Sequence, residues 1–239
     1  MRLDILMVEK KLAKSRNVAI DLIKNGKVQV NEEIITKPAK DINPNAPIKV
    51  LEQPKYVGRG GFKLEKALRE FIINPAGLTI LDIGSSTGGF TDCLLQNDAK
   101  KVYAVDVGTD QLDIKLKNDE RVVSMEKTDI RNIKTLPEKP DLAVIDVSFI
   151  SLELILQEVA NLLKTKAKII ALIKPQFETP KTSKDKNGIV KSEEIQEQVI
   201  EKIKKYCQTI KLKVLKITAS PILGGSGNKE FLILLQKTK

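Results

Sequence analysis

The 239-residue sequence contains no histidine and no tryptophan, and aromatic residues make up only 4% of it. Without an imidazole, a catalytic proton must be handled by lysine, a carboxylate, tyrosine or cysteine, and a histidine-ligated metal is excluded. The two cysteines, Cys93 and Cys207, are 114 positions apart and form no metal or redox motif. The sequence therefore predicts neither a metal centre nor a disulfide framework.

The sequence also lacks a hydrophobic run of the length that a membrane-spanning helix needs. Its first residues, M-R-L-D-I-L-M-V-E-K, are too interrupted by charge for a secretory signal peptide. We therefore expect a cytoplasmic protein without a membrane partner. Hydrophobic residues make up 41% of the chain, enough for a proper core, and 41 basic against 31 acidic residues give a net charge of +10, which favours a polyanionic partner.

A glycine-rich segment that follows the apolar run 78–81 is the most informative part of the sequence. Asp82 ends the run, residues 90–95 begin a helical pattern, and three glycines lie between them, Gly84, Gly88 and Gly89. Strand, glycine turn and helix form the first unit of a nucleotide-binding α/β sheet, whose ligand lies at the carboxyl end of the strand. Glycine permits a positive φ and a close approach of the ligand to the backbone.

This glycine turn does not fit the phosphate-binding motifs. The dinucleotide motif G-x-G-x-x-G fails because Ser86 stands at its second glycine, and no Gly-Lys-Ser/Thr follows as in a P-loop. The observed Asp-x-Gly-x-x-x-Gly-Gly-Phe resembles the S-adenosylmethionine turn of class I methyltransferases. A carboxylate suits that cofactor, which carries an ammonium, a sulfonium and ribose hydroxyls but no phosphate. A glycine-rich turn of another α/β enzyme is the alternative.

The first fifty residues predict two helices and three short strands. Ser15 is a suitable N-cap for the second helix, and Gly26 is a suitable end for it. The pattern R-L-D … S-R-x-x-A-x-x-x-I-x-x-G-x-V-x-V-N … K-P resembles the S4 RNA-binding domain. We place the domain boundary near Pro54 and divide the chain into an S4-like domain (1–52), a linker (53–61) and a larger domain (62–239).

The S4 resemblance implies that the first domain binds RNA. Residues 1–31 hold seven basic and three acidic residues, a local charge of +4. We expect basic side chains of this domain and of the linker to contact RNA: Arg2, Lys11, Lys14, Arg16, Lys24, Lys27 and Arg59. For any single lysine among them, an ordinary solvated helix face is the alternative.

Residues 62–239 alternate apolar strands with helical segments, as in an α/β fold. We expect the Rossmann-like fold of class I S-adenosylmethionine-dependent methyltransferases, with a mostly parallel seven-stranded sheet. Its last two strands are joined without a helix and should form an antiparallel pair at the edge. Asp106 stands where such folds hold a ribose diol. The predicted cofactor-binding residues are Asp82, Gly84, Ser85, Ser86, Gly88, Gly89, Phe90, Asp106, Val107, Asp129, Ile130 and Asp146.

Four charged residues form a second constellation. Asp146 and Lys174 end apolar strands, Lys63 stands near the start of a helix, and Glu230 lies beside a turn. In this order they resemble the catalytic tetrad of the FtsJ-like ribose 2′-O-methyltransferases. Together with the strings G-R-G-G-F-K-L, D-V-S-F-I-S, I-K-P-Q-F-E and G-N-K-E-F, and with the S4-like domain, they resemble the TlyA family over essentially the whole chain. An ordinary salt-bridge network is the alternative.

The TlyA resemblance implies transfer of a methyl group from S-adenosylmethionine to a ribose 2′-hydroxyl of ribosomal RNA. It further implies a cytidine, and for short members such as this one 23S rRNA. Because alignment provides much of the acceleration, the remaining step is removal of the hydroxyl proton. We assign to Lys174 either removal of that proton or stabilisation of the developing alkoxide, with Asp146 and Glu230 setting the orientation and protonation of the lysines and Lys63 helping to hold the ribose. The sequence does not decide which lysine, if either, is the base. A non-catalytic RNA-binding or ribosome-assembly factor, and a haemolysin (a label attached to the family), are the alternatives.

Overall fold

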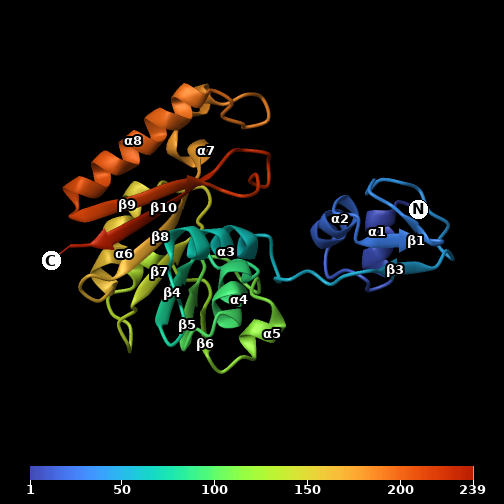
Figure 1. The fold of residues 1–239 in the computed structure, drawn as a ribbon, viewed down its shortest axis with the longest axis horizontal. Helices are drawn as coiled ribbons and strands as arrows, with labels where there is room; N and C mark the ends of the chain where they lie inside the picture. Colours follow the sequence, from blue (N-terminus) through green and yellow to red (C-terminus); the bar gives the residue numbers. More distant parts are fainter. Residues whose placement is uncertain (239) are drawn as a thin grey trace. The chain divides into compact units, whose positions relative to one another are not determined.

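The computed structural model describes residues 1–238 and shows two compact units, Met1–Lys55 and a second unit from Tyr56 onward (Figure 1). The sequence places residues 56–61 in a linker, whereas in the structure they pack with the second unit. The ring of Tyr56 is buried in the core of that unit and meets the ring of Phe62 edge to face, with centroids 5.3 Å apart. The change of unit therefore falls directly after Lys55.

The first unit folds as two helices against a small antiparallel sheet. Its elements are α1 (Leu3–Glu9), α2 (Arg16–Lys24), β1 (Val28–Val30), β2 (Glu33–Ile34) and β3 (Ile48–Val50), with β1 in the middle of the sheet. The Ser15 side chain accepts a hydrogen bond from the N–H of Val18, so the predicted N-cap of α2 is confirmed. Apolar side chains from both helices and from β1 form the core, among them Leu3, Met7, Ile23 and Val28.

The second unit is built on a seven-stranded sheet with the order β6-β5-β4-β7-β8-β10-β9. The strands are β4 (Thr79–Ile83), β5 (Lys101–Val105), β6 (Val122–Met125), β7 (Leu142–Ile145), β8 (Lys168–Ile173), β9 (Leu212–Ala219) and β10 (Phe231–Lys237). The first five pair in parallel, and β10 runs antiparallel to both β8 and β9. The predicted methyltransferase-like sheet, with its antiparallel pair at the edge, is confirmed.

Helices cover both faces of this sheet (Figure 1). The longer helices are α3 (Gly60–Phe71), α4 (Gly89–Gln96), α6 (Leu156–Leu162) and α8 (Glu193–Thr209). The short ones are α5 (Ile114–Lys117), α7 (Pro175–Glu178) and the 3₁₀ turns η1 (Ile130–Asn132), η2 (Leu152–Leu154) and η3 (Lys181–Ser183). One core contains side chains of α3, α4 and α5, and a second core, on the other face, contains side chains of α6 and α8. Strand β4 is buried along its whole length, which explains its continuous apolar run.

The parallel strands β4 to β8 all end at the same edge of the sheet, and the loops that follow them meet there. This edge holds the residues singled out from the sequence. Among the described residues, no helix has the length and hydrophobicity that crossing a membrane would require.

Candidate active site

The glycine turn after β4 has a backbone that only glycine accommodates easily. Gly84 has φ +79° and Gly88 has φ +96°, in the left-handed region. A Cβ on Gly84 would lie 2.6 Å from the carbonyl oxygen of Asp146. Gly84 therefore brings the turn after β4 directly against the loop after β7, which begins with a residue of the charged constellation.

Asp106, directly after β5, connects the glycine turn to the neighbouring loop. Its Oδ2 accepts a hydrogen bond from the N–H of Ser86 at 2.8 Å, and its Oδ1 accepts one from the N–H of Gly108 at 2.7 Å. Asp129 follows β6 and caps η1, and its carboxylate pairs with Arg131 at 2.5 Å, which lowers the pKa of Asp129. Asp106 thus follows β5, the strand next to β4, and Asp129 lies beyond the end of β6, which pairs with β5.

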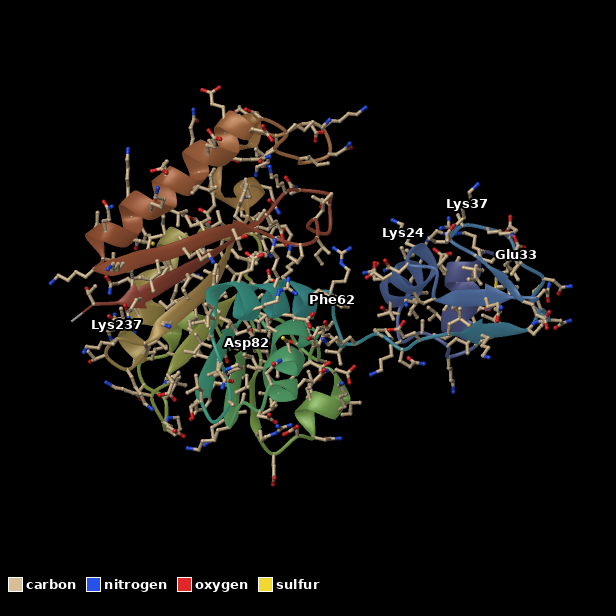
Figure 2. The ribbon with its side chains drawn as sticks, viewed as in Figure 1. Lys24, Glu33, Lys37, Phe62, Asp82 and Lys237 are labelled. Atoms are coloured by element: carbon tan, nitrogen blue, oxygen red, sulfur yellow. The ribbon has the colours of Figure 1, made fainter. Side chains whose placement is uncertain are left out.

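Asp82, within β4, is fully buried in the interior of the second unit (Figure 2). Its Oδ2 accepts a hydrogen bond from the Thr91 hydroxyl at 2.6 Å, while its Oδ1 has no hydrogen-bond partner among the described residues. Burial, with Asp146 and Asp106 nearby, raises the pKa of Asp82 to about 7. An unsatisfied buried carboxylate oxygen favours a cationic or hydrogen-donating neighbour.

The other predicted cofactor residues lie along the same edge. Ser85, Phe90 and Ile130 are buried, whereas Val107 is strongly exposed. Gly89 begins α4. The predicted set thus occupies the carboxyl ends of four neighbouring strands, β6, β5, β4 and β7, or the turns after them.

The four charged residues of the predicted tetrad meet in one cluster. The Lys174 amine lies 2.6 Å from Asp146 Oδ1, and the Lys63 amine lies 3.9 Å from Asp146 Oδ2. The Lys63 amine also lies 2.7 Å from Glu230 Oε2. Asp146 is therefore shared by two lysines, one of which is held by a second carboxylate. Each of the four side chains is less than a fifth exposed.

Local structure explains why these side chains point inward. Lys63 lies in the first turn of α3 on the buried face of that helix, which continues through Leu64 and Ala67. Glu230 directly precedes β10 and is covered by the turn at Gly224, where a Cβ would lie 2.2 Å from Glu230 Oε1. Lys174 directly follows β8, beside Asp146 on the neighbouring strand end.

Two polar residues to which the sequence gave no role bond to this cluster, Ser148 and Gln176, and a third, Glu178, bonds the segment that follows β7. The Lys174 amine donates to Ser148 Oγ at 3.1 Å, and Gln176 Nε2 donates to Glu230 Oε1 at 3.3 Å. Glu178 accepts hydrogen bonds from the Ser151 hydroxyl and the Leu152 N–H, and burial raises its pKa. All three residues lie within the sequence strings D-V-S-F-I-S and I-K-P-Q-F-E quoted above. Their hydrogen bonds join segments that are far apart in the sequence, and such contacts leave no periodic pattern from which they could be predicted.

An aromatic pair borders the cluster. Phe149 is 90% exposed and has φ +65°, a costly conformation for a bulky residue. Its ring lies 5.0 Å from the ring of Phe177, and the Lys174 amine lies 5.7 Å from that second ring. An exposed, strained aromatic side chain beside a charged cluster can stack against a planar ligand group such as a nucleobase.

The predicted RNA-binding residues fall into two groups. Arg2 and Arg16 both bond the buried carboxylate of Asp4, and Lys27 pairs with Glu52. The other predicted lysines of the first unit, Lys11, Lys14 and Lys24, are exposed, and Lys24 is labelled in Figure 2. In the second unit, Arg59 is exposed and donates to the carbonyl of Leu223 at 3.3 Å.

Chemically, the cluster offers two amines and two carboxylates where strand ends meet, with no imidazole. A lysine amine can stabilise a developing oxyanion or accept a proton, and the carboxylates fix its position. The carboxylates at the ends of β4, β5 and β6 supply acceptors for ammonium or hydroxyl groups.

Comparison with known proteins gives two matching family models. The FtsJ-like methyltransferase model matches residues 56–237, and the S4 domain model matches residues 1–48. YqxC of Bacillus subtilis (strain 168) is 46% identical, over 98% of this chain and 85% of that relative. A structure from Streptococcus thermophilus labelled a haemolysin has a TM-score of 0.80 and 43% identity, covering 100% of this chain and 89% of that chain.

Two further relatives carry the name TlyA. The 16S/23S rRNA (cytidine-2′-O)-methyltransferase TlyA of Mycobacterium tuberculosis is 36% identical, over 98% of this chain and 89% of the relative. The 23S rRNA (cytidine-2′-O)-methyltransferase TlyA of Campylobacter jejuni is 36% identical, over 97% of each chain. The resemblances stated from the sequence, to the S4 domain, to FtsJ-like methyltransferases and to TlyA, are confirmed.

Proposed function

Because this chain belongs to the TlyA family, in which an S4 domain precedes an FtsJ-like methyltransferase, we propose that it methylates the 2′-hydroxyl of a cytidine in ribosomal RNA, with 23S rRNA as the favoured target. S-adenosylmethionine is the proposed methyl donor. The observation that carries the proposal is the cluster in which Lys63 and Lys174 share Asp146. A ribose hydroxyl needs a proton acceptor, and this chain has no histidine to serve as one.

The residues at the carboxyl edge fit S-adenosylmethionine. Asp82 has an unsatisfied buried oxygen, which suits a ligand with cationic and hydrogen-donating groups. Asp106 offers carboxylate oxygens to a ribose diol, and the loop at Asp129 borders the same edge. The turn 84–89 contains no lysine or arginine, as expected for a ligand without phosphate. When bound, the cofactor supplies an electrophilic methyl group on a sulfonium.

Lys174 is the proposed group that handles the 2′-hydroxyl proton. Its amine is buried between Asp146 and Ser148, which fix its position. Lys63, held by Glu230, places a second positive charge beside Asp146, where it can hold the ribose or stabilise the developing oxyanion. Gln176 bonds the other Glu230 oxygen and thereby keeps that carboxylate in place.

The aromatic pair and the first unit supply the proposed RNA contacts. Phe149 presents an exposed ring against which a base of the target nucleotide can stack, because RNA-binding proteins commonly hold splayed bases on aromatic side chains. The basic residues predicted from the sequence would contact phosphates: Arg2, Lys11, Lys14, Arg16, Lys24, Lys27 and Arg59. Such contacts position the RNA without reading its sequence.

A methyl-transfer assay tests the proposal. Purified 30S and 50S subunits from cells that lack this protein are incubated with it and labelled S-adenosylmethionine, and 2′-O-methyls are then mapped on each rRNA. We expect one cytidine of 23S rRNA to be labelled, and no label with Lys174→Ala. Binding of subunits without any transfer by the wild-type protein would instead support an RNA-binding factor. Lysis of erythrocytes by the pure protein, without transfer, would support a haemolysin.

A further inference from the structure

A lysine-rich loop, residues 181–191, lies beside the proposed active site. It contains four lysines and a single acid, Asp185. The Asp185 carboxylate is used within the loop, because it accepts hydrogen bonds from the N–H groups of Asn187 at 2.8 Å and Ile189 at 2.9 Å. It also pairs with Lys191 at 3.0 Å, and these contacts together lower the pKa of Asp185. The loop therefore has a defined internal turn, and its one negative charge is already neutralised.

Asn228 anchors this loop to the active site. Its side chain is 1% exposed; its Oδ1 accepts from the N–H of Val190 at 2.9 Å, and its Nδ2 donates to the carbonyl of Gly188 at 3.2 Å. Gln196 Nε2 donates to the carbonyl of Val190 at 2.9 Å from the start of α8. Because Asn228 stands two residues before Glu230, the loop is fixed to the turn that carries a carboxylate of the charged cluster.

Two lysines of the loop keep unneutralised charges on its surface. Lys181 and Lys186 are exposed, and within residues 1–238 the structure gives neither an acidic partner. Figure 1 shows the loop between α7 and α8 next to the loop between β9 and β10, in agreement with the contacts of Asn228. Positive charge is thus displayed at the edge of the sheet where the proposed substrate ribose enters.

We propose that loop 181–191 is an RNA-contacting surface of the second unit, which binds phosphates flanking the target nucleotide through Lys181 and Lys186. Asn228 keeps these charges at a fixed position relative to Glu230. The inference rests on the proposed function, because it takes the substrate to be RNA. Lysines without acidic partners suit a polyanionic backbone, so the loop positions the RNA and does not select its sequence.

The test compares two pairs of charge removals in the full chain. Lys181→Gln with Lys186→Gln removes the loop charges. Lys139→Gln with Lys166→Gln removes two exposed lysines that precede β7 and β8, at the opposite ends of those strands, and serves as the matched control. Binding to purified 50S subunits is measured across a range of salt concentrations. We expect the loop variant to bind several-fold more weakly and to lose roughly one to two units of salt slope. Equal behaviour of the two variants would overturn the proposal.

Two further measurements test whether Asn228 anchors the loop and whether the loop lysines take part in the methyl-transfer step itself. Asn228→Ala keeps every lysine but releases the loop, so we expect weaker binding of subunits at unchanged S-adenosylmethionine affinity; wild-type binding would refute the anchoring. At limiting subunit concentration the Lys181/Lys186 variant should methylate several-fold more slowly than the wild type, and saturating subunits should reduce that difference; a loss of rate that saturation does not reduce would contradict a role in RNA binding. If the wild-type protein methylates no subunit, the proposed function fails, while the salt-dependent binding comparison still decides the loop.

Discussion

In each unit of this protein a carboxylate binds two cationic side chains, but the cations differ. In the first unit, the buried Asp4 accepts hydrogen bonds from Arg2 and Arg16. In the second, Asp146 pairs with Lys63 and Lys174. The arginine side chains are 42% and 54% exposed, whereas the lysine side chains are 8% and 9% exposed.

This difference decides which chemistry each cluster can perform. A guanidinium keeps its proton at any ordinary pH and presents a planar set of donors, so two half-exposed arginines on a fixed carboxylate suit permanent contact with phosphate. An ammonium in a desolvated site can give up its proton. We therefore expect the same arrangement of charges to serve RNA recognition in the first unit and proton handling in the second.

Asp82 shows a third arrangement, a buried carboxylate for which residues 1–238 provide no ion-pair partner. The Thr91 hydroxyl donates a hydrogen bond to it, and burial raises its pKa to about 7, whereas Arg2 and Arg16 hold the pKa of Asp4 at about 2. Both aspartates are fully buried. Desolvation is the largest cause of the raised pKa of Asp82, whereas the hydrogen bond from Arg2 is the largest cause of the lowered pKa of Asp4.

The largest expected effect comes from removing the lysine that most closely contacts Asp146. Lys174→Ala should lower the single-turnover rate of methyl transfer by about 10³-fold, as for loss of a proton-transfer group. Affinity for S-adenosylmethionine and for ribosomal subunits should remain near wild type. Lys174→Arg makes this second cluster resemble the first, and it should not restore the rate because a guanidinium cannot accept the proton.

Lys202 provides the matched control for this prediction. It pairs with Glu153, outside the cluster, so Lys202→Ala removes a lysine without touching Asp146. Its transfer rate should stay within a few-fold of wild type. A measurable rate for Lys174→Arg would assign Lys174 an electrostatic role only, and a near wild-type rate for Lys174→Ala would remove it from the mechanism.

The second prediction concerns the carboxylate without a cation. Because the folded-state pKa of Asp82 lies above its unfolded value of 3.8, the fold favours the neutral form, and stability falls as pH rises from about 4 to 7. Asp82→Asn should remove that decrease and raise the free energy of unfolding at pH 8 by up to about 4 kcal/mol. Tyrosine fluorescence reports this unit alone, since all three tyrosines lie in it.

A carboxylate with the opposite shift is the control for Asp82. Arg121 lowers the pKa of Asp119, so Asp119→Asn should lower stability at pH 8. If Asp82 also faces the cations of the cofactor, Asp82→Asn should weaken S-adenosylmethionine binding while it stabilises the fold. Parallel pH profiles for wild type and Asp82→Asn would show that Asp82 ionises normally in the folded protein.

The sequence predicted the ends of β5, β7 and β8, and that of β4 to within one residue, because each is an apolar run followed by a polar residue; β4 continues past Asp82 to Ile83. The runs before Asp82, Asp106, Asp146 and Lys174 are all strands in the structure, and the parallel order brings their ends together. These signals are local: hydrophobic period, glycine and charge lie within a few residues of one another. That is why the edge of the sheet, and the candidate residues on it, could be predicted.

The pairings within the cluster could not be predicted, because they join distant segments. Lys63, for example, is buried against Glu230, which is 167 residues away in the sequence. Asn228 and Gln176 were quoted within motifs but received no role, since a buried amide has no periodic signature. Their functions depend on loop conformations that only the folded chain displays.

The smallest expected effect concerns Asp4 and its two arginines in the first unit. The folded-state pKa of Asp4, about 2, lies below its unfolded value of 3.8, so its stabilising contribution is present above about pH 4 and is lost as pH falls toward 2. Asp4→Asn should cost the first unit about 1–2 kcal/mol at pH 7, less than a fully buried pair would, because the arginines are half-exposed. This unit contains no aromatic residue, so amide hydrogen exchange is the suitable measurement.

RNA binding then tests whether Asp4 orients Arg2 and Arg16 or only changes the net charge of the first unit. Asp4→Asn removes one negative charge, and so does Asp41→Asn at an 84% exposed carboxylate in the same unit, so each raises the net charge by one. Added charge alone should tighten binding to ribosomal subunits slightly in both variants. If Asp4 holds Arg2 and Arg16 in the orientation that RNA requires, Asp4→Asn should instead weaken binding by a few-fold while Asp41→Asn does not. Equal tightening in both would mean that these arginines act only through their charge.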